Sequence, residues 1–321
     1  MSSTDGSIGT DQTTMKPVHV ALAVLVAVIW GIAFVVSKVG LQSFTPPELT
    51  ALRFIVAALT VIWLPRPNIP WPTLIAIGLT IFTGQFLLQF FGISFGMPAG
   101  LTAVVSQTQA LFTVLFATIV IGDLPNARQI TGMLVAFAGL LLIGLTIGGS
   151  ITFLGFSLTL ASAISWAIGN VLVKRLPKVD MLRLMVWASL VPPLPALAIS
   201  FATDGRGALF SALTHASWSG IAAPIYLGLL ASVFAYAIWG SLLQRYSTGA
   251  VAPFALLSPC VGAITSAIVF GEQFGPLRIG GIAFMLIGLA IVAIPLRRLR
   301  LFSPSAHTSY QSGTQIDSSL P

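Results

Sequence analysis

Long apolar runs separated by short polar turns make up most of this sequence. Ten of these runs are long enough to cross a hydrocarbon core of about 30 Å, which takes roughly 20 helical residues. Because lipid cannot satisfy unpaired backbone groups, each run is predicted to be a helix rather than a strand. The predicted spans are 18–37, 47–64, 72–94, 98–121 and 128–147, followed by 151–173, 182–202, 217–243, 249–270 and 276–296.

The spacing of several glycines in the first half of the chain recurs in the second half, which indicates an internal repeat. An acidic residue recurs with them, because a shift of 149 residues aligns Asp123 with Glu272. A weaker similarity, at a shift of 136 residues, aligns Trp30–Lys38 with Trp166–Lys174. The glycines aligned by the first shift are Gly100 with Gly249, Gly122 with Gly271, Gly132 with Gly281, and Gly139 with Gly288.

Each half carries five spans, an odd number, so the second half must enter the membrane from the side opposite to the first. The predicted fold is an all-α polytopic membrane protein, with ten transmembrane helices in two inverted five-helix repeats at 18–147 and 151–296. Many secondary transporters have this architecture, with a substrate site near the midplane where the halves meet. The N-terminal tail at 1–17 and the tail at 297–321, rich in Ser, Thr and Gly, complete the chain, and the second is expected to be disordered.

Local signals mark the first two helix starts. The apolar run from Val18 to Val36 exceeds the 7 to 15 residues typical of a signal-peptide core, so it is expected to be a retained span. Thr45, followed by two prolines and Glu48, has the pattern of a capping box with prolines in the first turn. The second span is therefore expected to begin just after Thr45.

Composition agrees with a membrane protein, since the chain is 56% hydrophobic and only 7% charged, against about 25% charged residues in soluble domains. The net charge of +7 does not indicate a nucleic-acid partner, because the basic residues are scattered between apolar runs. They fit membrane topology instead, since positively charged loops stay in the cytoplasm. With a cytoplasmic N-terminus, only Lys38, Arg206 and Arg278 fall in outer loops. The eleven inner residues are Lys16, Arg66, Arg128, Lys174, Arg175, Lys178, Arg183, Arg245, Arg297, Arg298 and Arg300.

The sequence gives no sign of an enzyme, a cofactor or a metal site. Cys260 is the only cysteine and lies in an apolar run, so neither an intrachain disulfide nor a structural cysteine metal site is expected. The segment Gly92–Gly96, with Ser94 at its centre, matches the nucleophile-elbow pattern. A serine nucleophile needs a base within hydrogen-bond reach, and the three histidines lie at a span end, beside a loop and in the tail. An intramembrane hydrolase stays a remote alternative.

The carboxylates fall in tails, loops or helix ends rather than at mid-membrane. Ion coupling commonly uses a buried acid, because an ionisable group in the membrane is costly. This pattern favours facilitated export or exchange, while proton coupling through interfacial acids stays open. The eight acids are Asp5, Asp11, Glu48, Asp123, Asp180, Asp204, Glu272 and Asp317.

Polar side chains within the apolar spans are candidates for lining a cavity. Arg53 is the one charge within a span, and two alternatives stay open: it extends to the outer interface, or it faces a cavity and binds a substrate carboxylate. Gln85 and Gln89 are four residues apart and share one helix face. Span four carries Ser106, Gln107 and Gln109, and the other uncharged candidates are Asn170 and Ser258. The alternative role for each is a hydrogen bond between helices, worth about 0.6 kcal/mol.

Trp30 and Trp166 correspond between the two halves, and each lies well inside its span. Tryptophan in membrane proteins is most often found at the interface, so this interior pair predicts aromatic walls on the two sides of a central cavity. Pro98, Pro253 and Pro259 interrupt spans four and nine or their starts, as suits a gate that rocks between two conformations.

Several motifs resemble a known family. Ala51-Leu52-Arg53-Phe54 in span two and Phe270-Gly271-Glu272 after span nine resemble the EamA family of the drug/metabolite transporter superfamily, and the resemblance covers residues 18 to 296. More specific matches are Trp30-Gly31 with Phe34-Val35-Val36, the run Phe95 to Leu101, Ser165-Trp166-Ala167 with Gly169-Asn170, and Ile238-Trp239-Gly240. These are similar to inner-membrane exporters of amino-acid metabolites.

The resemblance implies an alternating-access exporter of small metabolites such as cysteine or O-acetylserine, with both termini in the cytoplasm. Its partners would be the small-molecule substrate and the lipid bilayer, with the oligomeric state left open. One departure is Ala33, where the family motif leads us to expect asparagine, and this leaves the substrate open. The alternatives are an exporter of aromatic amino acids or toxic organic cations, and a membrane receptor or scaffold that transports nothing.

Overall fold

The computed structural model describes residues 15–148, 150–177 and 179–293. Most of the predicted N-terminal tail and all of the predicted C-terminal tail lie outside these residues, as do Lys178 and the last residues of the tenth predicted span. Within the described part of the chain, ten helices are long and apolar enough to cross a membrane, and there is no strand. The prediction of an all-α polytopic membrane protein is confirmed.

The first half supplies five spans, of which only the first and fifth are single regular helices. The elements are α1 (Pro17–Gly40); α2 (Pro46–Ala58) with the 3₁₀-helix η1 (Leu59–Trp63); α3 (Trp71–Ile77), the π-helix η2 (Gly78–Gly84) and α4 (Gln85–Ser94); α5 (Ala99–Val105) and α6 (Thr108–Ile121); and α7 (Ala127–Gly144).

The second half follows the same order, with one added helix, α11, on the loop between its second and third spans. The elements are α8 (Phe153–Lys174); α9 (Met181–Ala188) and α10 (Pro193–Thr203); α11 (Ala208–His215); α12 (Trp218–Ile225), the π-helix η3 (Tyr226–Phe234) and α13 (Ala235–Arg245); α14 (Thr248–Ala255) and α15 (Leu257–Phe270); and α16 (Pro276–Ala293).

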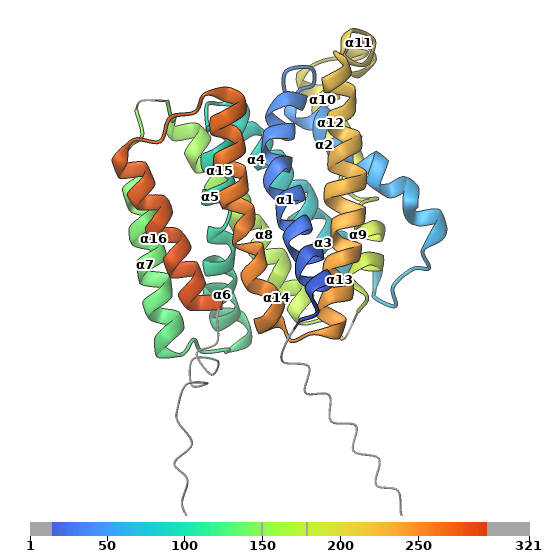
Figure 1. Cartoon of the computed structure of the whole chain (residues 1–321). Coiled ribbons are helices and arrows are strands. Elements are labelled where there is room, and N and C mark those ends of the chain that lie inside the picture. The colour runs from blue at the N-terminus through green and yellow to red at the C-terminus, as the bar shows by residue number, and fades with distance from the viewer. Residues whose placement is uncertain (1–14, 149, 178, 294–321) are drawn as a thin grey trace, which may run out of the picture.

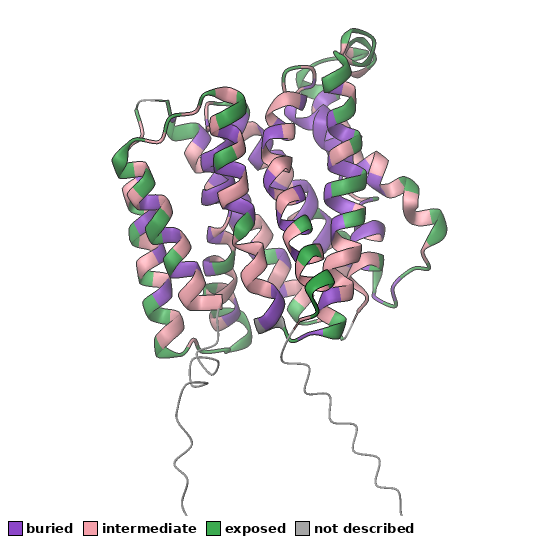
Figure 2. Cartoon of the chain, in the orientation of Figure 1, coloured by how far each residue is buried: buried purple, intermediate pink, exposed green. Residues whose placement is uncertain are grey.

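The helices form one bundle, in which α1 begins and α16 ends at the same end (Figure 1). We call this end the termini face, and the end at which α1 finishes the opposite face. Buried residues gather on the inward sides of the helices (Figure 2). Large apolar side chains remain exposed around the outside, including Ile119 (71%), Leu134 (66%) and Ile268 (78%). Such a surface is costly in water and suits a hydrocarbon environment.

The two halves meet in a reciprocal contact between α7 and α16, which lie side by side at one flank of the bundle (Figure 1). A Cβ added to Gly132 would lie 2.7 Å from the carbonyl oxygen of Gly288, and one added to Gly139 would lie 2.5 Å from that of Gly281. The repeat shift pairs Gly132 with Gly281 and Gly139 with Gly288, so each contact maps onto the other. A two-fold axis between two related halves produces this pattern. It is consistent with the inverted repeat, which stays a prediction.

Irregular helix turns also fall at corresponding places in the two halves. The π-helices η2 and η3 both lie in the third span of their half. Span four breaks between α5 and α6 at Ser106 and Gln107, and span nine breaks between α14 and α15 at Leu256. Pro98 precedes α5, and Pro259 lies in the first turn of α15. Pro253 lies inside α14 rather than at the break. Span four therefore breaks without a proline at the break itself.

Candidate functional site

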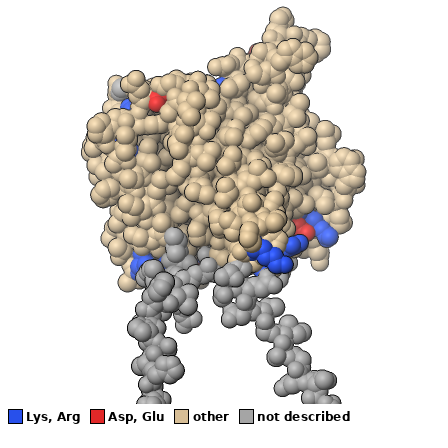
Figure 3. All heavy atoms as spheres, in the orientation of Figure 1, with Lys and Arg blue, Asp and Glu red and all other residues tan. Residues whose placement is uncertain are grey.

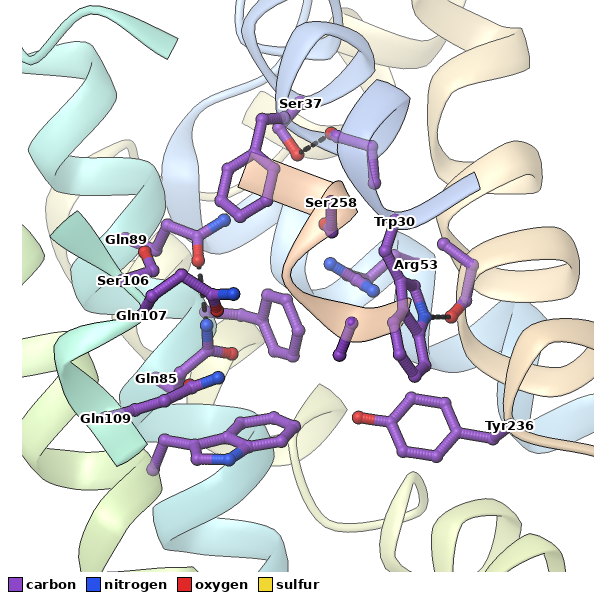
Figure 4. A pocket seen from close by; sticks show the side chains of 16 residues that line it. Trp30, Ser37, Arg53, Gln85, Gln89, Ser106, Gln107, Gln109, Tyr236 and Ser258 are labelled. Atoms are coloured by element: carbon purple, nitrogen blue, oxygen red, sulfur yellow. Dashed lines mark hydrogen bonds between the residues drawn. The ribbon is translucent and has the colours of Figure 1, made fainter. Parts of the chain in front are cut away.

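A cavity of about 180 Å³ lies in the interior of the bundle, between helices of both halves. Its lining includes seven of the eight residues singled out in the sequence (Figure 4): Trp30, Arg53, Gln85, Gln89, Gln109, Trp166 and Ser258. The eighth, Asn170, is not among the lining residues, and its amide nitrogen donates to the hydroxyl of Thr113 at 3.2 Å. Six of the ten spans predicted from the sequence thus carry these seven residues to one place.

Hydrogen bonds at the start of α2 fix how far Arg53 lies from the opposite face of the bundle. The backbone N–H of Thr45 donates to the carboxylate of Glu48 at 2.9 Å, which is one of the bonds of the predicted capping box. The Thr45 hydroxyl donates to Asp204 at the end of α10, also at 2.9 Å. From this anchored start, Arg53 lies about two turns into the helix.

Arg53 is 3% exposed and lines the cavity, so it does not extend to the outer interface, while its binding of a substrate carboxylate stays a prediction. Its Nη2 donates to the hydroxyl of Ser232 at 3.0 Å and to the carbonyl oxygen of Leu227 at 3.3 Å. The guanidinium carbon lies 3.8 Å from the centroid of the Phe86 ring, within cation–π range. Arg53 is held in place by groups from span three and span eight.

The π-helix η3 explains how Arg53 finds partners among apolar residues. Both partners, Leu227 and Ser232, lie in η3, and the Ser232 hydroxyl also donates to the Leu227 carbonyl at 2.8 Å. A π-helix shifts backbone bonds from the usual spacing of four residues to five, and such turns are frequent at functional sites. In η3, one carbonyl is thereby shared by a serine and an arginine.

Arg53 retains unused binding capacity. Its Nε is buried without a hydrogen-bond partner among the described residues, and no described Asp or Glu forms an ion pair with it. A buried charge without a counter-charge is costly, and an arginine donates two parallel bonds to a carboxylate. The cavity is therefore suited to an anionic group.

Gln85 and Gln89, on one face of α4, bring a hydrogen-bond acceptor to the cavity in addition to the donors of Arg53. The amide nitrogen of Gln85 donates to the side-chain oxygen of Gln89 at 2.7 Å, as their spacing on one helix face predicts. The side-chain oxygen of Gln85 is buried without a partner among the described residues. It is an acceptor in the same cavity as the donor groups of Arg53 (Figure 4).

Aromatic rings close parts of the cavity wall. The indole nitrogen of Trp30 donates to the carbonyl oxygen of Ala231 at 3.0 Å, and its ring packs on Tyr236 and Trp239 at centroid distances of 5.4 and 5.2 Å. Trp166 also lines the cavity, as does Tyr236, whose ring is labelled in Figure 4. These rings offer flat apolar surface beside the polar groups.

The break in span four places two more of its polar residues at the cavity. Ser106 and Gln107 line the cavity at the break itself, and the Ser106 hydroxyl is buried without a partner among the described residues. Ser37 and the rings of Phe34 and Phe86 also line it. Ser106 and Gln107 could be found from the cluster of polar residues in span four. Phe34 and Phe86 could not be identified as lining residues from the sequence, because phenylalanine is common on every face of these spans.

The described residues show no arrangement for metal binding or for serine catalysis. They hold no group of three or more His, Cys, Asp or Glu side chains that could bind a metal ion. Ser94 is exposed at the end of α4. The ring of His19 is bonded to Tyr246, and that of His215 contacts Ser211 and Thr214 on its own helix, so neither is placed to activate Ser94.

Comparison with known proteins agrees with this architecture. The family model of the EamA-like transporter family matches residues 18–145 and again residues 153–294. The chain belongs to the EamA-like transporter family. As a member of this family, it is a multi-pass membrane transporter, and the same model matches each half of its sequence.

Two curated relatives carry the same descriptive name, "Probable amino-acid metabolite efflux pump". The protein from Salmonella typhimurium is 40% identical over 277 residues, covering 84% of this chain and 93% of the relative. The protein from Escherichia coli is 38% identical over 283 residues, covering 86% and 95%. A crystal structure that is 17% identical matches 89% of this chain and all of its own with a TM-score of 0.59, which supports the fold alone.

Proposed function

We propose that this EamA-family protein exports small zwitterionic amino-acid metabolites, such as cysteine or O-acetylserine, across the inner (plasma) membrane by alternating access. The observation that carries the proposal is the buried Arg53, which has an unpartnered Nε and no ion pair among the described residues and faces a small cavity. The names of its two relatives, amino-acid metabolite efflux pumps, support the same substrate class.

Each lining residue has a proposed part in binding. Arg53 binds the substrate carboxylate, and the free amide oxygen of Gln85 accepts a hydrogen bond from the ammonium group. Trp30 and Trp166 form apolar walls for the side chain. The remaining polar groups, which bind the polar part of the side chain, are Gln89, Gln109 and Ser258. Asn170 lies one turn beyond Trp166 on α8, where it would contact substrate on the route towards the termini face.

The size and charge of the cavity favour small zwitterions over bulkier or cationic compounds. Pockets for drug-sized ligands measure roughly 300–1,000 Å³, whereas this cavity measures about 180 Å³. Among the described residues that line it, Arg53 is the one with a charged side chain, and it repels a cation. The alternative, an exporter of aromatic amino acids or lipophilic cations, therefore has less support.

The test is efflux from liposomes that contain the purified protein and are preloaded with labelled cysteine or O-acetylserine. We expect saturable efflux that is absent from protein-free liposomes, that needs no imposed pH gradient, and that neutral amino acids inhibit while lipophilic cations do not. Gln89→Ala and Trp166→Ala should each slow it. Folded protein that moves neither compound would refute the substrate assignment, and normal rates in both variants would refute the cavity assignment.

A further inference from the structure

Two ion pairs join the halves of the chain, one at each end of the bundle. Lys38, near the end of α1, pairs with Glu272, just after α15, with an Nζ to Oε1 distance of 3.0 Å at the opposite face. Lys174, at the end of α8, pairs with Asp123, just after α6, at the termini face. Each pair takes its lysine from the first span of one half and its acid from the fourth span of the other.

The repeat maps one ion pair onto the other. The shift of 136 residues aligns Lys38 with Lys174, and the shift of 149 aligns Asp123 with Glu272. The reciprocal glycine contacts between α7 and α16 have the same symmetry. The two ion pairs therefore occupy equivalent positions in the two halves, one at each face of the membrane.

The two pairs differ sharply in their surroundings. The side chains of Lys38 and Glu272 are 33% and 10% exposed. The Glu272 carboxylate also accepts the backbone N–H groups of Ala99 and Gly100, which start α5, at 2.9 and 3.0 Å. Lys38 lies 4.2 Å from the centroid of the Phe270 ring. At the other end, the side chains of Lys174 and Asp123 are 46% and 57% exposed. An exposed pair of this kind stabilises little, so the two ends are in different states.

The partly buried Lys38–Glu272 pair lines a second cavity that adjoins the central one. Ser37 lines the central cavity that holds Arg53, and the next residue, Lys38, lines a second cavity of about 490 Å³ together with Glu272. This second cavity lies at the opposite face, where Arg278 and Ser150 also line it. The contact of Lys38 with Glu272 thus lies next to the central cavity, on its side towards the opposite face.

We propose that these pairs are the two gates of the transport cycle, and this inference rests on the proposed transport function. In the described conformation, the Lys38–Glu272 pair, together with the bonds of Glu272 to the start of α5, closes the path to the opposite face. In the alternate conformation this gate separates, and Asp123 with Lys174 becomes the buried pair. Asp123 then caps the start of α14 at Thr248 and Gly249, which the shift of 149 aligns with Ala99 and Gly100. Each acid closes one face by binding a lysine and a helix start.

A labelling experiment tests the gates without any transport measurement. Ala33, which lines the central cavity, is replaced by cysteine in a Cys260→Ala background. A membrane-impermeant maleimide is added to intact cells, in which the opposite face is expected to be outside. Glu272→Gln should raise the labelling rate at least about fivefold, and Asp123→Asn should lower it by a similar factor, because loss of a gate favours the state in which that gate is open. In inside-out vesicles both effects should reverse.

The matched control is Asp180→Asn, which removes the acid of a third pair, Asp180 with Arg183 at 3.7 Å, within one helix start. Asparagine still caps that helix, so the labelling rate should not change. Rates are normalised to labelling of the same protein after denaturation, which excludes effects of expression. Equal shifts in both gate variants, or no shift, would overturn the proposal. Expected labelling without cysteine or O-acetylserine efflux would refute the substrates and leave the gates standing.

Discussion

Arg53 carries its charge into a region where most side chains are apolar, and not all of its hydrogen-bond donors have partners there. One terminal nitrogen is bonded to the π-helix η3 and one face packs on Phe86, while Nε has no partner among the described residues. Groups that serve only the fold are normally satisfied when buried. An arginine that is firmly held but lacks one hydrogen-bond partner is better explained by a ligand that supplies that partner.

Replacement of Arg53 should therefore separate charge from geometry. Arg53→Gln should reduce kcat/KM for metabolite efflux from liposomes by about 10- to 150-fold, the range expected for losing a hydrogen bond to a charged group. Arg53→Lys keeps the charge and loses the planar fork and the stacking on Phe86, so it should recover only part of the activity. The measurement is the initial efflux rate as a function of internal substrate concentration.

Arg66 offers a matched control for this series. It lies in the loop after η1, donates to the carbonyl of Ile69 at 2.8 Å and stacks on Trp71, outside the cavity. Arg66→Gln should leave kcat/KM unchanged. A loss of activity as large as that of Arg53→Gln would show that the effect comes from removal of an arginine in general rather than from the cavity.

Sequence and structure agree on these side chains to different degrees. Gln85 and Gln89 could be placed on one face from their spacing alone, and the structure joins them by a hydrogen bond. The sequence left Arg53 undecided, because helix rotation depends on packing against other spans. Its partner Ser232 lies 179 residues away, so no local pattern connects them.

Helices differ in how far local signals determine them. The spans were predictable because hydropathy and caps are local. The Thr45–Glu48 bond at the start of α2 is present, and α6 ends just before Gly122, which has a positive φ of 76°. The π-helices η2 and η3 and the break at Ser106 were not predictable. Such turns exchange one set of backbone bonds for another, and tertiary packing decides which set forms.

The contact between α7 and α16 gives a prediction about stability. A Cβ at Gly139 would lie 2.5 Å from both the carbonyl oxygen of Gly281 and the backbone nitrogen of Met285, and backbone cannot move aside cheaply. Gly139→Ala should destabilise the protein by about 1–3 kcal/mol, as overpacking does. The measurement is the midpoint of thermal unfolding in detergent, which should fall.

Gly280 provides the comparison, because it is a glycine of α16 at which an added Cβ meets nothing within 4 Å. Gly280→Ala should leave the midpoint unchanged or raise it, since alanine is the better helix former. Similar midpoints for the two variants would contradict the close approach of α7 and α16.

Charge is sorted between the two faces of the molecule in a way that follows from the order of the spans. Lys and Arg side chains gather around the termini face in the view of Figure 3. Their contacts agree: Arg245 bonds to His19 near the start of α1, Arg175 bonds to the carbonyl of Val120 near the end of α6, and Arg128 bonds to that of Val292. Because loops rich in Lys and Arg stay in the cytoplasm, we infer that the termini face is cytoplasmic.

Reporter fusions test this orientation for the whole protein. A fluorescent protein fused after residue 321 should be bright, and alkaline phosphatase at the same position should be inactive, because that enzyme folds only where disulfides form. Phosphatase inserted in the loop between α10 and α11, at Gly205, should be active, since that exposed loop lies at the opposite face. The inverse pattern would place Lys38–Glu272 at the cytoplasmic side and would contradict this orientation.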